Sequence, residues 1–447
     1  MIRIPAQATS GWGRSSSSRS VEPSTRLRDI IPPFAAIGVL TLAHIAYGGV
    51  QPIAVFSLAA LFTAIAGASL IAAGPRYVTS GMIAVAVILA IYAFSGIAGP
   101  AHRAAAPLAV VFAAGALWMI GYIAARQRQV LDVMWAVLIW AAIAYCFLMF
   151  ALNAARVPSG QRFIMDAFET PANASILFGL FAVIGLSKIL HVVKQMDAEA
   201  LARHTMIDRL LSRGLSGILL FGISLTCLTL TGSLSGFILT LAVLLLLMWW
   251  DTLTISTREY RGLPMRLAAM TTPLIVLGLI GWAASLAWFN GETGQTLGAT
   301  DALPTAQRLG AYLSAWLNSP AFGHGLGSIE AEGAKAMTLF NAKAMLVAGE
   351  ARNAPVTWLV ETGIIGSSLL LLVLGAMHFR IFTALKARRA PRTFLRLAVA
   401  ATVLLLLHGF TDSSLDLPSA VWLYALLLGA ACGVATGRRI EPRAAKQ

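Results

Sequence analysis

Arg308 and Tyr312 are the first candidates for a chemical role, because they lie four residues apart in a segment with helical spacing of apolar residues. On a helix this spacing puts a guanidinium and a phenol on one face. At the depth of lipid headgroups such a pair suits a lipid-linked phosphate. An Arg that anchors an interfacial helix to ordinary phospholipid would give the same pattern.

Small and polar residues follow this helix in two stretches. Residues 322–327 carry Gly at every second position around His324, and alternating Gly lets backbone approach a ligand or another helix closely. Arg352 and Asn353 precede the next apolar segment, and Glu361 lies inside it. An ionisable residue in a membrane span usually faces the bundle interior and serves a purpose. A flexible connector would also explain the Gly-rich stretch.

A third group of polar residues surrounds the turn before Pro418. His408 and Asp412 are four residues apart, so a hydrogen-bonded pair is expected if they share a helix, and Asp416 follows. Acidic residues at a membrane boundary are also commonly just solvated.

The elements that position these residues are membrane-spanning helices. Hydrophobic residues make up 58% of the 447 residues and charged residues 12%, with a mean hydropathy of +0.78. A span needs about 20 mostly apolar residues, because backbone polar groups must be paired within it. The sequence therefore predicts an all-α, polytopic membrane protein with about 12 transmembrane helices and one long periplasmic loop. The expected spans are 34–50, 52–74, 80–98, 105–124, 130–152, 172–193, 214–231, 235–250, 265–289, 355–377, 393–411 and 418–436.

Charge predicts the orientation of these spans. With twelve spans, 26 of the 33 Lys and Arg residues fall on one side, which the positive-inside rule makes cytoplasmic. The chain is then expected in the bacterial inner membrane with both termini in the cytoplasm. Its regions would be a disordered tail (1–30), a bundle of about nine helices (31–289), a periplasmic loop with an amphipathic helix (290–354), three further spans (355–436) and a second tail (437–447).

The same charge distribution argues against a nucleic-acid partner. A net charge of +14 would otherwise suggest one, but here the basicity marks topology and the lipid bilayer is the expected partner. The three cysteines fall in expected spans, so buried free thiols are predicted, and no metal site or other cofactor is expected.

Several stretches, in order along the chain, resemble the O-antigen ligase and polymerase family. The segment from Arg308 to Trp316, followed by 319–327, is similar to that family's Arg-containing amphipathic helix and its Gly-x-Gly-x-Gly turn. Residues 352–366 resemble its loop-exit His-Asn and Glu-x-Gly-x-x-Gly signature, with Arg352 in place of the His. Three shorter stretches are similar to other family segments: 168–174, 231–236, where Leu234 replaces an Arg, and 408–418.

This resemblance implies a GT-C-like architecture. It also implies a metal-free enzyme that moves a glycan from undecaprenyl diphosphate to an acceptor hydroxyl, on a glycan or on lipid A core, at the periplasmic face. Arginines would stabilise the departing diphosphate, and a histidine would stand in for the missing base. The implied catalytic residues are Arg308, Arg352, His324 and His408. The implied substrate-binding residues are Arg162, Tyr312, Asn353, Glu361 and Asp412.

Three alternatives remain open, one of which is an inactive relative with a structural role, since Arg352 replaces the family's His. Within the class, the chain would be a polymerase of O-antigen or exopolysaccharide repeat units, since the donor chemistry is shared. In another class, it would be a transporter or lipid flippase, which commonly shows internal repeats and charges along a pathway. The sequence contains no clear repeat, and its polar groups cluster at one face of the membrane.

Overall fold

Apolar helices make up the part of the chain that the computed structural model describes. This part comprises residues 27–46, 51–73, 101–156, 171–197, 203–255, 302–348, 353–387, 392–411 and 417–437, with the single positions 86, 90 and 168. Its helices are α1 (Leu27–Ile45), α2 (Pro52–Ala73), α4 (Ala101–Ala124), α5 (Arg128–Arg156), α7 (Pro171–Asp197), α8 (Arg203–Leu230), α9 (Leu234–Ile255), α11 (Ala302–Leu317), α12 (Ile329–Ala336), α13 (Ala342–Ala348), α14 (Ala354–Lys386), α15 (Arg392–Thr411) and α16 (Pro418–Thr436).

Nine of the described helices are long and apolar enough to cross a bilayer: α2, α4, α5, α7, α8, α9, α14, α15 and α16. The apolar part of α1, Asp29–Ile45, is shorter. The chain is therefore a polytopic α-helical membrane protein. The expected span 265–289, and all of 80–98 except positions 86 and 90, lie outside the described residues, so the total of twelve stays a prediction.

Small residues hold the bundle together where helices cross closely. A Cβ on Gly429 of α16 would meet the backbone of Trp118 in α4, and one on Gly433 would meet the backbone of Tyr122. Likewise, a Cβ on Gly185 of α7 would lie 2.7 Å from a backbone nitrogen of α8. Without a hydrophobic driving force between helices in lipid, such close backbone packing is a main source of association. The most buried spans are α7, α15 and α16.

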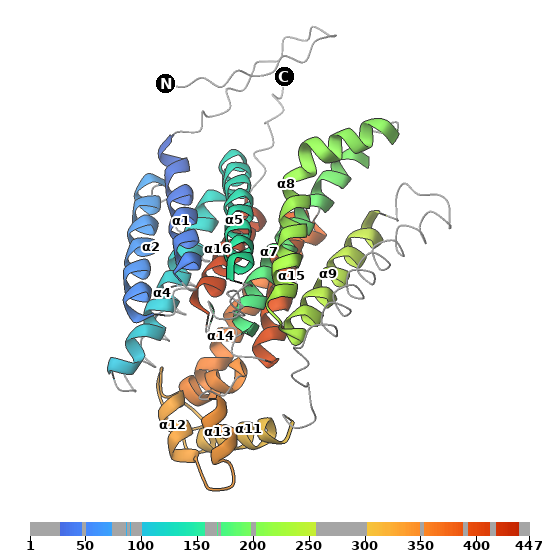
Figure 1. Cartoon of the computed structure of the whole chain (residues 1–447). Helices are drawn as coiled ribbons and strands as arrows, with labels where there is room; N and C mark the ends of the chain where they lie inside the picture. The colour runs from blue at the N-terminus through green and yellow to red at the C-terminus, as the bar shows by residue number, and fades with distance from the viewer. Residues whose placement is uncertain are drawn as a thin grey trace, which may run out of the picture.

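The two ends of the bundle differ. At one end, Arg126 in the turn between α4 and α5 donates to Thr436 at the end of α16. Asp29 at the start of α1 lies there beside Ala73 and Gln127. These are ends that the charge rule assigns to the cytoplasm, and they gather on one side. At the opposite end, α11, α12 and α13 form a separate layer across the ends of the spans (Figure 1).

This layer, together with residues 354–362 of α14, is called the cap below. Its small core contains Ala311, Tyr312, Met345, Val356 and Val360. The cap is therefore a packed unit built on the start of α14.

Candidate functional site

A break in α14 joins the cap to the bundle. Gly363 has φ 65° and ψ −174°, which interrupts the helix. In an unbroken helix, the amides of Ile364 and Ile365 would donate to the carbonyls of Val360 and Glu361. The break leaves four backbone groups that need other partners.

The loop 320–325 inserts into this break and supplies all four partners. The amides of His324 and Gly325 donate to the carbonyls of Val360 and Glu361, at 2.8 and 2.9 Å. In return, the amides of Ile364 and Ile365 donate to the carbonyls of Pro320 and Ala321, at 2.9 and 3.1 Å. The loop thus replaces the two lost helical hydrogen bonds with four.

Two glycines face each other at the centre of this insertion. Gly323 has φ 72°, and a Cβ there would lie 2.5 Å from the backbone carbonyl of Glu361. A Cβ on Gly363 would collide with the backbone of Ala321. Gly325 and Gly327 also have positive φ. The alternating Gly pattern therefore serves the expected close backbone approach, and the partner is another part of the chain.

Glu361 fixes the far side of the same loop. Its Oε1 accepts from the amide of Gly327 at 2.9 Å, and the amide of Ile329 at the start of α12 also donates to this carboxylate. The side chain is 8% exposed. A buried carboxylate that accepts backbone N–H bonds at a helix start holds the cap in place. This arrangement supports a positioning role for Glu361.

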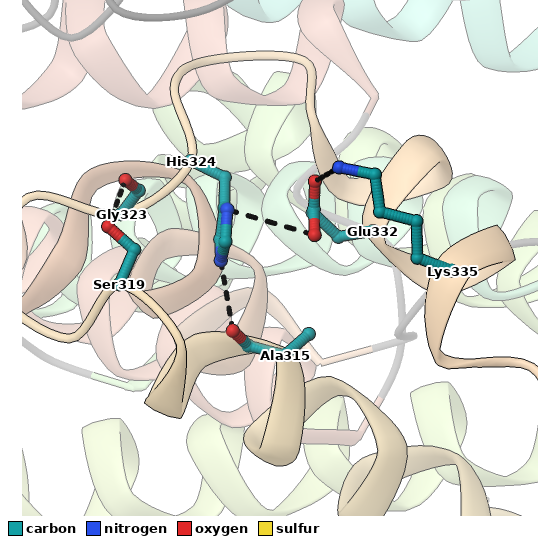
Figure 2. A network of polar contacts seen from close by, with 6 residues as sticks. All are labelled: Ala315, Ser319, Gly323, His324, Glu332 and Lys335. Carbon is teal, nitrogen blue, oxygen red and sulfur yellow. Dashed lines mark hydrogen bonds and ion pairs between the residues drawn. The ribbon is translucent and has the colours of Figure 1, made fainter.

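His324 sits between protein partners on both ring nitrogens (Figure 2). Its Nε2 lies 2.9 Å from the carbonyl oxygen of Ala315, which can only accept, so Nε2 carries the proton. Its Nδ1 lies 3.7 Å from Oε2 of Glu332, and Oε1 of Glu332 accepts from Lys335 at 2.6 Å. The ring is thus held in one orientation, with Nδ1 facing a carboxylate.

Arg308 and Tyr312 share one side of α11, as their spacing predicts. That side faces the interior of the cap, because their side chains are only 8% and 2% exposed. The Tyr312 ring packs against Gly333 of α12 and belongs to the cap core. The expectation that this pair is presented at the surface, among lipid headgroups, therefore does not describe this structure. A molecule that contacts this guanidinium would have to reach into the cap, as the described residues place it.

Asn353 and His408 lie where α14 begins and α15 ends. The Asn353 side chain caps α14 through Val356 N, at 3.1 Å, and donates to the carbonyl of Phe410 at 2.9 Å. His408 is fully buried, and among the described residues neither ring nitrogen has a hydrogen-bond partner. Arg162, Arg352 and Asp412 lie outside the described residues, so their place relative to this group stays a prediction.

The sequence reading missed two polar groups inside the bundle. Arg396 forms a buried ion pair with Asp251 and lies over the ring of Trp250. Arg396 lies in the expected span 393–411, and the structure places it in α15. A lone Asp and a lone Arg in apolar runs were the signal that could have paired them.

The second missed group is a hydrogen-bonded chain that crosses three spans. The Nε2 atom of His378 in α14 lies 2.8 Å from the hydroxyl of Thr402 in α15. That hydroxyl lies 3.0 Å from the hydroxyl of Tyr424 in α16. Interhelical bonds of this kind tie membrane helices together.

Within the described residues, no three His, Cys, Asp or Glu side chains gather as metal ligands would. The three cysteines are free and buried, as predicted. No protein-family model matches the chain, and no curated protein is significantly similar to it. The fold thus defines the class, a polytopic α-helical membrane protein with a helical cap.

Proposed function

We propose that the chain is a glycan transferase of the bacterial inner membrane. It moves a glycan from undecaprenyl diphosphate to an acceptor hydroxyl, with the cap in the periplasm and both termini in the cytoplasm. The acceptor is lipid A core, as for an O-antigen ligase.

The observation that carries this proposal is the contact between Gly323 and Gly363. The two stretches that most resemble the O-antigen ligase family, 319–327 and 352–366, are far apart in sequence. Four backbone hydrogen bonds join them at the end of the bundle, and the helix that bears Arg308 packs on the same part of α14. The two stretches that resemble the family therefore belong to one structural unit. This supports the proposal that they form a functional site like that of the family.

Glycan transfer requires a cation near the departing diphosphate, because negative charge develops there. Arg308 supplies a planar guanidinium inside the cap, where exclusion of water strengthens its interaction with an oxyanion. The sugar carbon to diphosphate oxygen bond breaks, the acceptor oxygen bonds that carbon, and the acceptor proton passes to a base. The product polyprenyl diphosphate leaves sideways into the bilayer.

The test is complementation of a deletion strain, read on a polysaccharide gel. Wild-type protein restores lipid A capped with long glycan, whereas Arg308→Ala leaves the strain uncapped with the protein still in the membrane. Lys343→Ala, which removes an exposed cation from the same cap, is the matched control and restores capping. Full capping by Arg308→Ala would refute the role of this guanidinium.

The same gel separates the alternatives. Loss of only the long chains in the deletion strain indicates a polymerase. An unchanged pattern favours a transporter, for which the observation in hand is the buried pair Asp251 and Arg396 inside the bundle. Ionisable residues in spans often mark transport pathways. A glycan pattern that changes in neither capping nor chain length would therefore overturn the transferase proposal.

A further inference from the structure

The surface of α11 divides into three faces. One face is buried in the cap and another is exposed and polar, with no charged residue on any exposed position from 306 to 318. The remaining exposed face is apolar, with Leu313 and Leu317 being 39% and 65% exposed. Within each set, residues are related by spacings of three, four or seven positions, as on one face of a helix. The buried set is Arg308, Ala311, Tyr312 and Ala315; the polar set is Gln307, Ser314 and Asn318; the apolar set is Ala306, Gly310, Leu313 and Leu317.

The apolar face of α11 leads through the inserted loop to the lipid-facing side of α14. Phe322 follows directly in that loop and is 61% exposed. Its neighbour Ala321 bonds to Ile365, and Ile364 and Ile365 are both about half exposed at the start of the span. Further along α14, exposed Leu371, Leu372 and Phe379 continue this surface. A span in a membrane presents such side chains to acyl chains.

We propose that Leu313, Leu317 and Phe322 form a lipid-contact strip, which seats the cap in the outer boundary of the bilayer that surrounds α14. Continuity with the apolar surface of the span identifies the occupant as lipid.

A second exposed apolar pair in the cap provides a contrast. Leu339 and Phe340 are 98% and 93% exposed on a turn between α12 and α13 that the side chain of Asn341 holds in place. Exposed Lys335 and Lys343 flank this turn in sequence. It lacks the hydrogen-bonded continuity with α14, and it serves as the water-exposed control.

This contact would fix the orientation of the cap relative to the bilayer. With its apolar face against lipid and its Arg308 face toward the cap core, α11 separates acyl chains from the cap interior by the width of one helix. A lipid-linked molecule would then reach the cap sideways from the bilayer. This inference depends on the membrane-embedded bundle and is independent of the transferase proposal.

The test measures spin-label accessibility in full-length protein in lipid nanodiscs. Single-site labels are placed by Leu317→Cys and Phe322→Cys, with Leu371→Cys as the lipid-facing reference and Leu339→Cys as the aqueous reference. The native cysteines are buried, and unsubstituted protein gives the background. Power saturation compares dissolved oxygen, which partitions into acyl chains, with a water-soluble nickel complex.

The proposal expects residues 317 and 322 to be more accessible to oxygen than to nickel, as at 371, with the opposite order at 339. Nickel accessibility at 317 and 322 that matches residue 339 would show water there and overturn the proposal. Protection from both reagents would overturn it too, with dipolar broadening indicating a second copy of the chain and no broadening indicating contact within the chain. Glycan transfer does not enter this measurement, so its outcome is separate from that of the transferase proposal.

Discussion

Replacing Gly363 with Ala tests the join between cap and bundle most directly. The residue has φ 65° and ψ −174°, a conformation that is essentially restricted to glycine. The new methyl group would also collide with the backbone of Ala321 in the inserted loop. We expect the loop 320–325 to be held more weakly in the break while the spans stay assembled.

The magnitude follows from these two effects. Backbone strain costs about 1–3 kcal/mol. Each of the four hydrogen bonds contributes about 1 kcal/mol, so a variant that keeps half of them is destabilised locally by about 3–5 kcal/mol. Because about 1.4 kcal/mol corresponds to a factor of ten, the amides of the join should exchange about 10²- to 4 × 10³-fold faster.

The assay is hydrogen exchange with mass spectrometry on protein in nanodiscs. It follows peptides that contain the donating amides His324, Gly325, Ile364 and Ile365. Gly375→Ala is the matched control, because this glycine lies in the same helix and a Cβ there would meet nothing within 4 Å. Exchange at the four amides that is equal in Gly363→Ala and wild type would refute the reasoning, since the inserted loop would then not depend on the glycine.

Two further predictions concern contacts between helices. Asp251→Ala leaves Arg396 buried without its counter-ion and should lower the free energy of unfolding by about 3–5 kcal/mol. The double variant Asp251→Leu with Arg396→Met should recover most of this stability. Thermal unfolding in detergent measures both variants, and an unchanged midpoint for Asp251→Ala would contradict the buried pair. Asn353→Ala should lower stability by about 1 kcal/mol, because the hydrogen bond that caps the N-terminus of α14 is lost. Asn353→Asp should keep this N-terminal hydrogen bond while losing the bond to Phe410. Equal exchange rates at the Val356 amide in the two variants would contradict the capping role of Asn353.

The spans were predictable because each is marked by one continuous stretch of the sequence. An apolar run of about 20 residues must become a helix in a bilayer whatever its neighbours are. The expected spans 214–231 and 235–250 are an example, since α8 ends at Leu230 and α9 begins at Leu234. The break in α14 was not predicted, because 355–377 reads as one apolar run and only a partner distant in sequence stabilises Gly363 outside a helix.

The cap shows the corresponding limit for the candidate site. A spacing of four residues correctly placed Arg308 and Tyr312 on one side of a helix, but spacing alone does not say whether that side faces lipid or protein. The choice depends on Val356 and Val360, which cover Tyr312 from another helix. The side left exposed carries Leu313 and Leu317. Apolar residues on two sides of a helix thus predict that both sides are covered, but they do not tell which side faces protein and which faces lipid.

The two candidate histidines differ in whether their ring nitrogens have hydrogen-bond partners among the described residues. His324 donates through Nε2 to the backbone and points Nδ1 at Glu332, which holds the ring but gives it structural partners. His408 is buried, and neither of its nitrogens has a partner within the described residues. An unpaired buried imidazole costs about 1–3 kcal/mol, so a purely structural His408 would be replaced by Phe with no loss.

If His408 is the base instead, His408→Phe and His408→Gln should both lower the turnover of glycan transfer by about 10²- to 10⁴-fold, while the Phe variant keeps or raises the unfolding midpoint. His324→Gln is the comparison and should leave turnover near that of the wild type, because the amide can replace the bond to Ala315. Wild-type turnover by a stably folded His408→Phe protein would remove His408 from the reaction and direct the search for the base to the stretches around Arg352 and Asp412.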